Sequence, residues 1–368
     1  MPTVRRLRVR DVRTYDRADV ALGPRLTIIH GPNGAGKTNL LEALYIGLTG
    51  RSCRTGNDRE VLRFDAQALR VEVEIEAADG LHELAVGYEP AQLRRLTADG
   101  APVERLLDVA FRPLVSVFLP DRLELVKGAP AGRRAHLDQV VAALWPARAA
   151  SRRAYARALA QRNALLSRVR SAGTPRSSLS TWDLELGRHA LALRDDRDRA
   201  AELIAPGVTE IAAELGLSGA VELRYRPRTR AASAAQFAEE LAGRLEADLT
   251  RGFTGHGPHR DDLILSRDGR ELRVYGSQGE QRLGLLALLL SERDALAGAR
   301  EDPPLLLLDD VMSELDAERR ERLVARVTRV GQVVLTTTDL AHVPDAEGTG
   351  VVRLAVGDGV VREEALAG

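Results

Sequence analysis

The chain has 368 residues, and its 53 Lys and Arg residues balance 53 Asp and Glu residues to give a formal net charge of zero. This balance excludes proteins that bind polyanions through bulk charge alone, such as histone-like proteins. Apolar residues make up 44% of the chain and charged residues 29%, a composition that predicts an ordinary soluble globular protein.

Lysine and cysteine are both rare. Only Lys37 and Lys127 are lysines, so a lysine in this chain points to a specific role more strongly than one of the many arginines does. The single cysteine, Cys53, excludes an intramolecular disulfide and fits a reducing compartment. The N-terminus lacks the apolar core of a signal peptide, and no apolar run approaches the roughly 20 residues that span a bilayer. We therefore expect a cytoplasmic protein without a membrane partner.

The first 120 residues predict an α/β arrangement in which strands surround one helix. A glycine-rich loop separates the strand Leu26–His30 from a helix over residues 39–48. Asp79 and Gly80 form the turn of a predicted hairpin. The other predicted strands are residues 4–12, 71–77, 84–88 and 114–119.

Residues 121–216 are rich in alanine and arginine with helical spacing, and prolines and a serine-rich stretch divide them. Strands return after this segment. The later predicted elements are strands Val221–Arg226, 262–266, 272–274, Leu305–Leu308, Val333–Thr337 and 351–355, and helices 234–249 and 281–297. We expect residues 1–120 and 217–368 to be the halves of one head, and 121–216 an inserted compact helical arm with helices of about 25 residues, or about 37 Å.

The loop after the second strand matches the pattern G-x-x-x-x-G-K-[ST] of nucleotide-binding proteins. In such loops backbone N–H groups surround the β-phosphate, Lys37 reaches the β- and γ-phosphates, and the Thr38 hydroxyl binds Mg²⁺. A chance glycine-rich turn is the alternative, but the strand before and the helix after favour an ATP site. The predicted ATP-binding residues are Gly31, Pro32, Asn33, Gly34, Ala35, Gly36, Lys37, Thr38 and Asn39.

A second acidic motif ends the apolar strand Leu305–Leu308. Asp309 is predicted to hold Mg²⁺ beside Thr38, and Asp310 to orient or deprotonate the attacking water, so Asp310 and Lys37 are the predicted catalytic residues. An ordinary strand end with a helix-capping aspartate is the alternative. The long chain separation between Lys37 and Asp309 indicates a large insertion within one nucleotide-binding head.

A third motif, Ser277, Gln278, Gly279, Glu280 and Gln281, precedes a strong helix. Ser277 and Glu280 have the spacing of a capping box, and a capped helix start also binds anions. The order of these motifs, followed by Ser313 and Asp316, resembles the ATP-binding-cassette heads of the SMC-like family. This resemblance implies head-to-tail dimers on ATP, in which the third motif acts in trans and Ser313 and Asp316 lie at the dimer seam.

Further blocks resemble the RecF family of SMC-like ATPases. They are residues 33–45, 50–52, 119–128 and 257–262, Arg133 and Arg134 with Asp138, and residues 311–316. The resemblance implies a nucleoid-associated recombination mediator that binds DNA with ATP, hydrolyses ATP slowly and helps to load a RecA-type recombinase at single-strand gaps. RecR and RecO are the partners that it implies.

The chain departs from the wider cassette pattern at three places. Asp310 stands where transporters usually carry glutamate, so we expect slow hydrolysis. The segment after residues 333–337 has no switch histidine, and Thr338 or Asp339 is the candidate substitute. No glutamine stands clearly in a Q-loop, for which Asp121 is the only candidate.

Residues 146–176 contain eight arginines and no Asp or Glu. Arg148, Arg152, Arg153 and Arg157 lie in pairs four residues apart, which places each pair on one helix face able to contact DNA phosphates. A solvated face of an arginine-rich protein is the alternative. Few aromatic residues accompany them, which favours duplex over single-stranded DNA.

Three other interpretations remain open from the residues alone. The cassette could serve a transporter, which the inserted basic helices and the absent switch histidine disfavour. The phosphate loop could instead belong to a small-molecule kinase, which needs neither the third motif nor the dimer loop. His256 and His259 could bind a metal ion, but their spacing matches no familiar ligand set and favours a structural turn.

Overall fold

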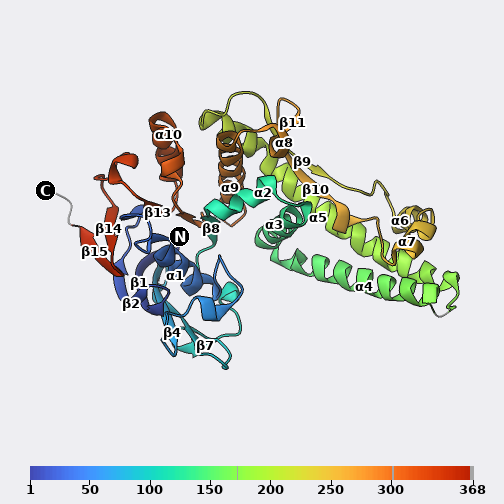
Figure 1. The fold of residues 1–368 in the computed structure, drawn as a ribbon, viewed down its shortest axis with the longest axis horizontal. Helices are drawn as coiled ribbons and strands as arrows, with labels where there is room; N and C mark the ends of the chain where they lie inside the picture. Colours follow the sequence, from blue (N-terminus) through green and yellow to red (C-terminus); the bar gives the residue numbers. More distant parts are fainter. Residues whose placement is uncertain (172, 301, 365–368) are drawn as a thin grey trace. The chain divides into compact units, whose positions relative to one another are not determined.

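The computed structural model describes residues 1–171, 173–300 and 302–364 (Figure 1). The chain divides into two compact units, one formed by Met1–Asp121 with Leu296–Gly368 and the other by Arg122–Ala295. Residues 217–295 therefore group with the helical segment, whereas the sequence assigned them to the head. The reason is that β9 (Val221–Arg226) pairs with β10 (Asp262–Arg267) and packs against the long helix α5 (Leu179–Glu214).

The first unit contains a six-stranded antiparallel sheet in the order β2-β1-β4-β5-β6-β7. Its longer strands alternate buried apolar and exposed polar residues, because one face packs on the core and the other meets solvent. The strands are β1 (Thr3–Val12), β2 (Tyr15–Ala21), β4 (Leu69–Ala77), β5 (Gly80–Tyr88), β6 (Arg95–Ala98) and β7 (Ala101–Pro102).

The same unit contains a second six-stranded sheet in the order β15-β14-β3-β13-β12-β8, parallel except for its edge strand β15. All four leucines of β12 are buried, as expected for a strand covered on both faces. The strands are β3 (Leu26–His30), β8 (Val115–Phe118), β12 (Leu305–Leu308), β13 (Val333–Thr337), β14 (Val351–Gly357) and β15 (Val360–Glu364).

Helix α1 (Lys37–Thr49) contacts both β4 of the antiparallel sheet and β13 of the parallel sheet. Its apolar side chains join the two sheets in one core. The helix approaches β4 so closely that a Cβ atom on Gly47 would lie 2.3 Å from a methyl carbon of Val73. Glycine at this position therefore sets how deeply the helix packs.

The second unit is mainly helical. Helix α4 (Ala149–Ser171) packs along α5, which has 36 residues and continues through Pro206 (Figure 1). At 1.5 Å per residue, α5 is about 54 Å long and exceeds the expected length. The remaining elements are α2 (Glu124–Lys127), α3 (Pro130–Leu144), α6 (Ala234–Ala242), α7 (Leu245–Arg251), β11 (Arg270–Glu271), α8 (Leu272–Tyr275) and α9 (Gln278–Arg300).

Two predicted elements are wrong. Residues 272–274 form the short helix α8 and not a strand, because three residues are too few to distinguish the period of a strand from that of a helix. The single helix predicted over 234–249 is two helices, α6 and α7, separated at Gly243 and Arg244. The sequence interpretation also missed β2, β6, β7, β11, β15 and α10 (Ala317–Val327).

Buried ion pairs join the elements of the second unit. The Arg197 guanidinium on α5 donates to Asp138 on α3 over 2.7 and 3.1 Å and to the Pro258 carbonyl over 2.8 Å. Arg133 pairs in the same two-pronged way with Asp262, over 2.7 and 3.0 Å. Two of the blocks that carry the family resemblance therefore meet in space and hold α3, α5 and β10 together.

We predict that Arg197→Met lowers the free energy of unfolding of the second unit by about 3–5 kcal/mol, because it leaves Asp138 buried without its counter-ion. Urea unfolding of the full chain measures the change. Arg188→Met on the same helix is the matched control: Arg188 is 72% exposed, so the substitution should cost no more than about 0.5 kcal/mol. Equal effects of the two substitutions would contradict the structural role of the pair.

Candidate nucleotide-binding site

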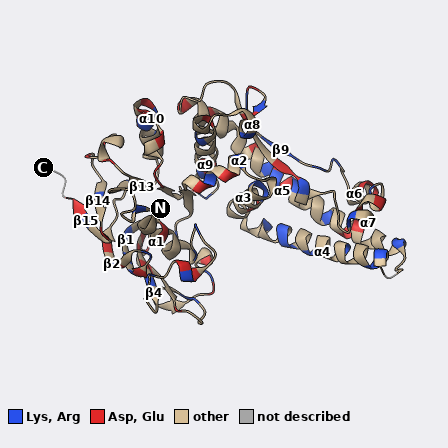
Figure 2. Ribbon diagram, in the orientation of Figure 1, with Lys and Arg blue, Asp and Glu red and all other residues tan. Residues whose placement is uncertain are grey.

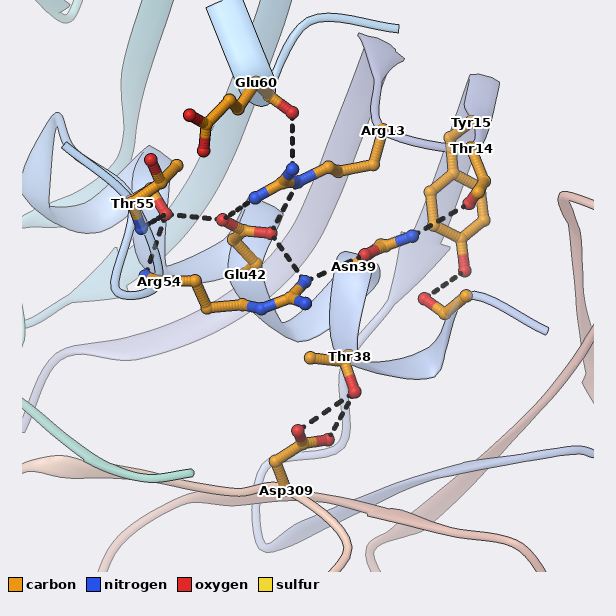
Figure 3. Close-up of polar contacts among 12 residues, drawn as sticks. Arg13, Thr14, Tyr15, Thr38, Asn39, Glu42, Arg54, Thr55, Glu60 and Asp309 are labelled. Atoms are coloured by element: carbon orange, nitrogen blue, oxygen red, sulfur yellow. Dashed lines mark hydrogen bonds and ion pairs between the residues drawn. The ribbon is translucent and has the colours of Figure 1, made fainter. Parts of the chain in front are cut away.

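The glycine-rich loop lies between β3 and α1, at the carboxyl end of the parallel sheet. Gly36 caps the helix with a left-handed φ of 110°, and a Cβ atom there would lie 2.9 Å from the Thr14 hydroxyl. The buried Tyr15 hydroxyl donates to the Gly36 carbonyl over 2.9 Å (Figure 3). The start of β2 therefore holds the end of the loop in place.

The Lys37 side chain folds back over the loop. Its ammonium group donates to the carbonyls of Gly31 and Pro32 over 2.8 and 2.9 Å. Burial lowers the pKa of Lys37, while the charges of Asp310 and Asp309 act in the opposite direction. A cation that holds only neutral carbonyls by hydrogen bonds is well placed to receive a phosphate group.

Thr38 and Asp309 lie together, as predicted from the two motifs. The Thr38 hydroxyl is 2.9 Å from both Asp309 carboxylate oxygens (Figure 3). Thr336 donates a third hydrogen bond to this carboxylate over 2.7 Å. Burial raises the pKa of Asp309, and the bonds from Thr336 and Thr38 oppose this effect. One hydroxyl and one carboxylate match the few protein oxygens that usually hold Mg²⁺ beside nucleotide phosphates.

Asp310 follows with a left-handed φ of 49°, and its backbone N–H donates to the Thr336 hydroxyl over 2.9 Å. One of its carboxylate oxygens is buried and accepts no hydrogen bond from the residues that the structure describes. A buried oxygen without a donor is costly, and a water molecule would satisfy it. The role of Asp310 in orienting the attacking water stays a prediction.

A buried carboxylate beneath the loop escaped the sequence interpretation. Glu42 on α1 accepts two hydrogen bonds of 2.9 Å from Arg13 and one of 3.2 Å from Arg54 (Figure 3). Burial raises the pKa of Glu42, but the hydrogen bonds from Arg13 and Ser52 and the charges of both arginines outweigh it and lower the pKa overall. The sequence did contain a signal for this site: Glu42 lies on the apolar face of the helix predicted over residues 39–48.

Asn39, predicted in the ATP-binding set, connects this cluster to the turn between β1 and β2. Its side-chain amide donates to Thr14 over 3.2 Å, and its carbonyl oxygen accepts from Arg54 over 3.1 Å. Both sides of the Asn39 amide are therefore used within the protein. The arrangement positions the segment after α1 beside the first turn of that helix.

The Ser277–Gln281 motif forms the predicted capping box at the start of α9. The Ser277 N–H donates to the Glu280 carboxylate over 2.8 Å, and the Glu280 N–H donates back to the Ser277 hydroxyl over 3.3 Å. Glu280 also pairs with Arg267, and the Gln281 amide donates inward to two backbone carbonyls. Ser277, Gln278 and Gly279 are exposed.

The residues after the acidic strand make local contacts. The Ser313 hydroxyl donates to the Asp310 carbonyl over 3.0 Å, and Asp316 caps α10 by accepting from the Arg319 N–H over 2.9 Å. The Asp339 carboxylate accepts from the Ala341 N–H over 2.9 Å. Asp121 lies in a 3-10 turn, Pro120–Leu123. None of these contacts tests the predicted roles of Ser313 and Asp316 at the dimer seam, of Asp339 as the switch residue or of Asp121 in the Q-loop, so these roles stay predictions.

The arginines of residues 146–176 do not form one uncompensated face, contrary to the count from sequence. Acids from other segments pair with four of them. These pairs are Arg148 with Asp196, Arg152 with Asp138, Arg162 with Asp183 and Asp248, and Arg176 with Glu246. Arg162 is wholly buried. The remaining four, Arg153, Arg157, Arg168 and Arg170, are exposed on α4 and form no ion pair among the described residues. Figure 2 shows the basic residues distributed along this helix.

The two histidines of the glycine–proline loop serve the fold. His256 bonds to Glu240 over 2.6 Å, and His259 bonds to the Tyr155 hydroxyl over 2.6 Å and the Thr254 carbonyl over 2.9 Å. Within the described ranges no group of three His, Cys, Asp or Glu side chains could hold a metal ion. None of the described helices is long and apolar enough to cross a membrane.

Residues 6–94 match the family described as AAA domain. The DNA replication and repair protein RecF of Anaeromyxobacter sp. (strain Fw109-5) is 40% identical over 366 residues, covering 96% of this chain and 97% of that protein. The RecF protein of Acidothermus cellulolyticus (strain ATCC 43068 / DSM 8971 / 11B) is also 40% identical, over 346 residues, covering 90% of this chain and 92% of its own length.

The fold is similar to those of solved structures of RecF and of an Smc head. The structure titled as the recombination mediator protein RecF with ATP in the RecFOR pathway has a TM-score of 0.84 and 25% identity, covering 99% of this chain and 98% of that chain. An Smc head bound to the C-winged helix domain of ScpA has a TM-score of 0.62 and 16% identity, covering 99% of this chain and 98% of that chain, and supports the fold alone. The fold is thus an α/β cassette-type ATPase head of the SMC-like kind with a helical insertion.

We predict that Asp309→Asn removes most of the Mg²⁺-dependent stabilisation by ATP. In the unsubstituted protein, ATP at about 100 times its Kd should stabilise the folded state by about 2.7 kcal/mol. The amide keeps the shape of the side chain but loses the charge that attracts Mg²⁺. Thermal melting with ATP, with and without Mg²⁺, measures the difference.

Without nucleotide, the Asp309→Asn variant should melt no lower than the unsubstituted protein, because it no longer buries a charge. This measurement separates loss of binding from loss of folding. Asp108→Asn, at an exposed position of the same unit, is the control and should leave the ATP effect unchanged. Full retention of the Mg²⁺-dependent shift in Asp309→Asn would contradict the assignment.

Proposed function

Because the chain belongs to the RecF family of DNA replication and repair proteins, we propose that it is an ATP-dependent, DNA-binding recombination mediator. The convergence of Lys37, Thr38, Asp309 and Asp310 at one end of the parallel sheet carries this proposal. No observation favours the transporter subunit or the small-molecule kinase.

In this proposal the loop from Gly31 to Asn39 binds ATP through backbone N–H groups and the start of α1. Lys37 exchanges its carbonyl partners for phosphate oxygens, and Thr38 and Asp309 hold Mg²⁺, which would neutralise phosphate charge. Asp310 orients the attacking water through its unsatisfied oxygen. Its side chain is one methylene shorter than glutamate, so hydrolysis is slow and the protein acts as a switch more than as a rapid ATPase.

ATP binding brings two copies together head to tail. The signature of one copy, Ser277 to Gln281, contacts the γ-phosphate bound to the other, and Ser313 and Asp316 lie at the seam. The exposure of Ser277, Gln278 and Gly279 at a capped helix start supports this role. Within the signature, Glu280 and Gln281 also shape that helix start.

DNA binds along α4 through its unpaired arginines. Arg153, Arg157 and Arg168 are separated by about one and about three helical turns, so they share one face. Guanidinium groups spaced along a helix contact phosphates without reading the base sequence. Arg148 and Arg152, predicted in the same set, contribute less because Asp196 and Asp138 already pair with them.

The partners are a recombinase of the RecA type and the proteins RecR and RecO, and the site of action is a single-strand gap next to duplex DNA. This part of the proposal rests on the family resemblance and on the pathway named for the related solved structures. No residue contact within this chain is used to identify these partners.

We predict that Lys37→Arg and Ser277→Arg each abolish ATP-dependent dimers of the full chain, as measured by size-exclusion chromatography with light scattering. Arginine's fork does not replace the lysine point charge in the loop. Ser277→Arg should leave ATP binding intact, because it acts on the partner's nucleotide. Ser180→Arg, at another exposed serine, is the control. Normal dimers of Ser277→Arg would refute the action in trans.

Replacing Arg153, Arg157 and Arg168 with glutamine should weaken duplex DNA binding and reduce the slope of log K against log salt by about 2 to 3, since each phosphate contact contributes about 0.9. Fluorescence anisotropy over a salt series measures both quantities. Arg152→Gln on the same helix is the matched control and should change the slope by less than Arg157→Gln does. An unchanged slope in the triple variant would reject this face.

A further inference from the structure

The outer face of the antiparallel sheet carries a row of arginines. Strand register places Arg17 opposite Arg10, Arg10 opposite Arg70, Arg70 opposite Gly87, and Gly87 opposite Arg95. The row crosses five strands, and at about 4.8 Å per strand it spans about 19 Å. Like charges directly opposite each other destabilise a sheet, so the fold itself gains nothing from this row.

The neighbouring rows of the same face are built differently. In the next row, two residues away along β1, Arg8 lies opposite Asp19 and Glu72. Arg8 also forms ion pairs with Glu74 and Glu83 over 3.6 and 3.4 Å. Arginines and carboxylates therefore alternate and neutralise each other there. In the arginine row, by contrast, every side chain that lies in register is an arginine, or is absent at Gly87.

The arginines of this row, defined as Arg17, Arg10, Arg70 and Arg95, are exposed. Arg10 is 69% exposed, with Asp11 3.8 Å away, and Arg70 is 60% exposed and pairs with Glu72. Among the described residues, Arg95 donates to the neutral Gln92 side chain, over 3.0 Å, and to no carboxylate. Most of the guanidinium donors in the row are therefore available to an outside ligand.

The row borders a groove of about 520 Å³. Arg10, Arg70 and Arg95 line it, and its small residues Ala85 and Gly87 leave room between the flanking side chains. Tyr88 and Leu93 add an apolar wall, and Leu93 is 92% exposed. Two acidic residues, Asp11 and Glu89, line it as well. The groove thus combines three arginines with two acids and one largely exposed apolar side chain, Leu93.

These features favour a narrow acidic ligand over duplex DNA. Adjacent rows are about 7 Å apart, at two residues of 3.4 Å. The major groove alone is about 12 Å wide, so a duplex lying on the row would also cover the carboxylates Glu72, Glu74 and Glu83. A single extended peptide covers the arginine row alone, and its carboxylates match guanidinium groups in two-pronged hydrogen bonds.

We propose that the arginine row and its groove bind an extended acidic segment of a partner protein, with carboxylates on the arginines and one apolar side chain against Leu93 and Tyr88. This site is separate from the nucleotide-binding residues, and binding requires neither ATP nor DNA.

The test uses the full chain and a fluorescein-labelled peptide in which three glutamates alternate with threonine and a leucine follows. Anisotropy titrations compare it with the same peptide carrying glutamine. Replacing both Arg10 and Arg70 with glutamine should weaken binding of the glutamate peptide at least about tenfold. The matched control replaces Arg188 and Arg224, which are 72% and 73% exposed, and should change binding less than about twofold.

The double variant should melt no lower than the unsubstituted protein, because it relieves repulsion between opposite arginines. Equal affinity for the glutamate and glutamine peptides would overturn the proposal, as would unchanged binding by the double variant. A third arm measures duplex DNA of random sequence. If the double variant loses as large a factor for the duplex as for the peptide, the row is a nucleic-acid surface and the acidic-peptide proposal is wrong.

Discussion

The register of three parallel strands determines the chemistry of this protein. Leu335 of β13 lies opposite both Ile28 of β3 and Leu308 of β12, so the carboxyl ends of all three strands meet at one edge. The phosphate loop leaves from β3, the acidic pair from β12, and Thr336 from β13 between them. A shift of one residue would turn Asp309 away from Thr38. All four leucines of β12 are buried, so an apolar strand carries the acidic pair to a polar site.

The second unit keeps its elements together by a different means. Besides its buried apolar residues, the second unit has several buried side chains that are charged. Arg162 and Arg197 each bridge segments that are far apart in the chain, and each is almost completely removed from water. Such pairs add little net stability compared with apolar packing, but removing one partner is costly. They specify which segments pack together along the long helices α4 and α5.

Local patterns carried most of what the sequence could predict. The phosphate loop, the acidic strand and the capping box each depend on residues within one short segment, and the structure has each as a strand–loop–helix, a buried strand or a capped helix. The errors arose where distant segments decide the outcome. The excess of arginine in residues 146–176 was counted without Asp138, Asp196 and Asp248, which lie elsewhere in the chain. Glu42 was passed over because its partners, Arg13 and Arg54, come from either side of its helix.

The scarcity of lysine gives this protein an unusual reactivity toward reagents that attack primary amines. Apart from the N-terminus, such a reagent meets only Lys127, which is half-buried, and Lys37, which is 7% exposed and occupied by the loop carbonyls. Enzymatic acylation of lysine and amine cross-linking therefore sample almost none of the surface, however basic that surface is. The same property makes the amine of Lys37 a natural reporter: its accessibility reflects the state of the phosphate loop against a nearly silent background.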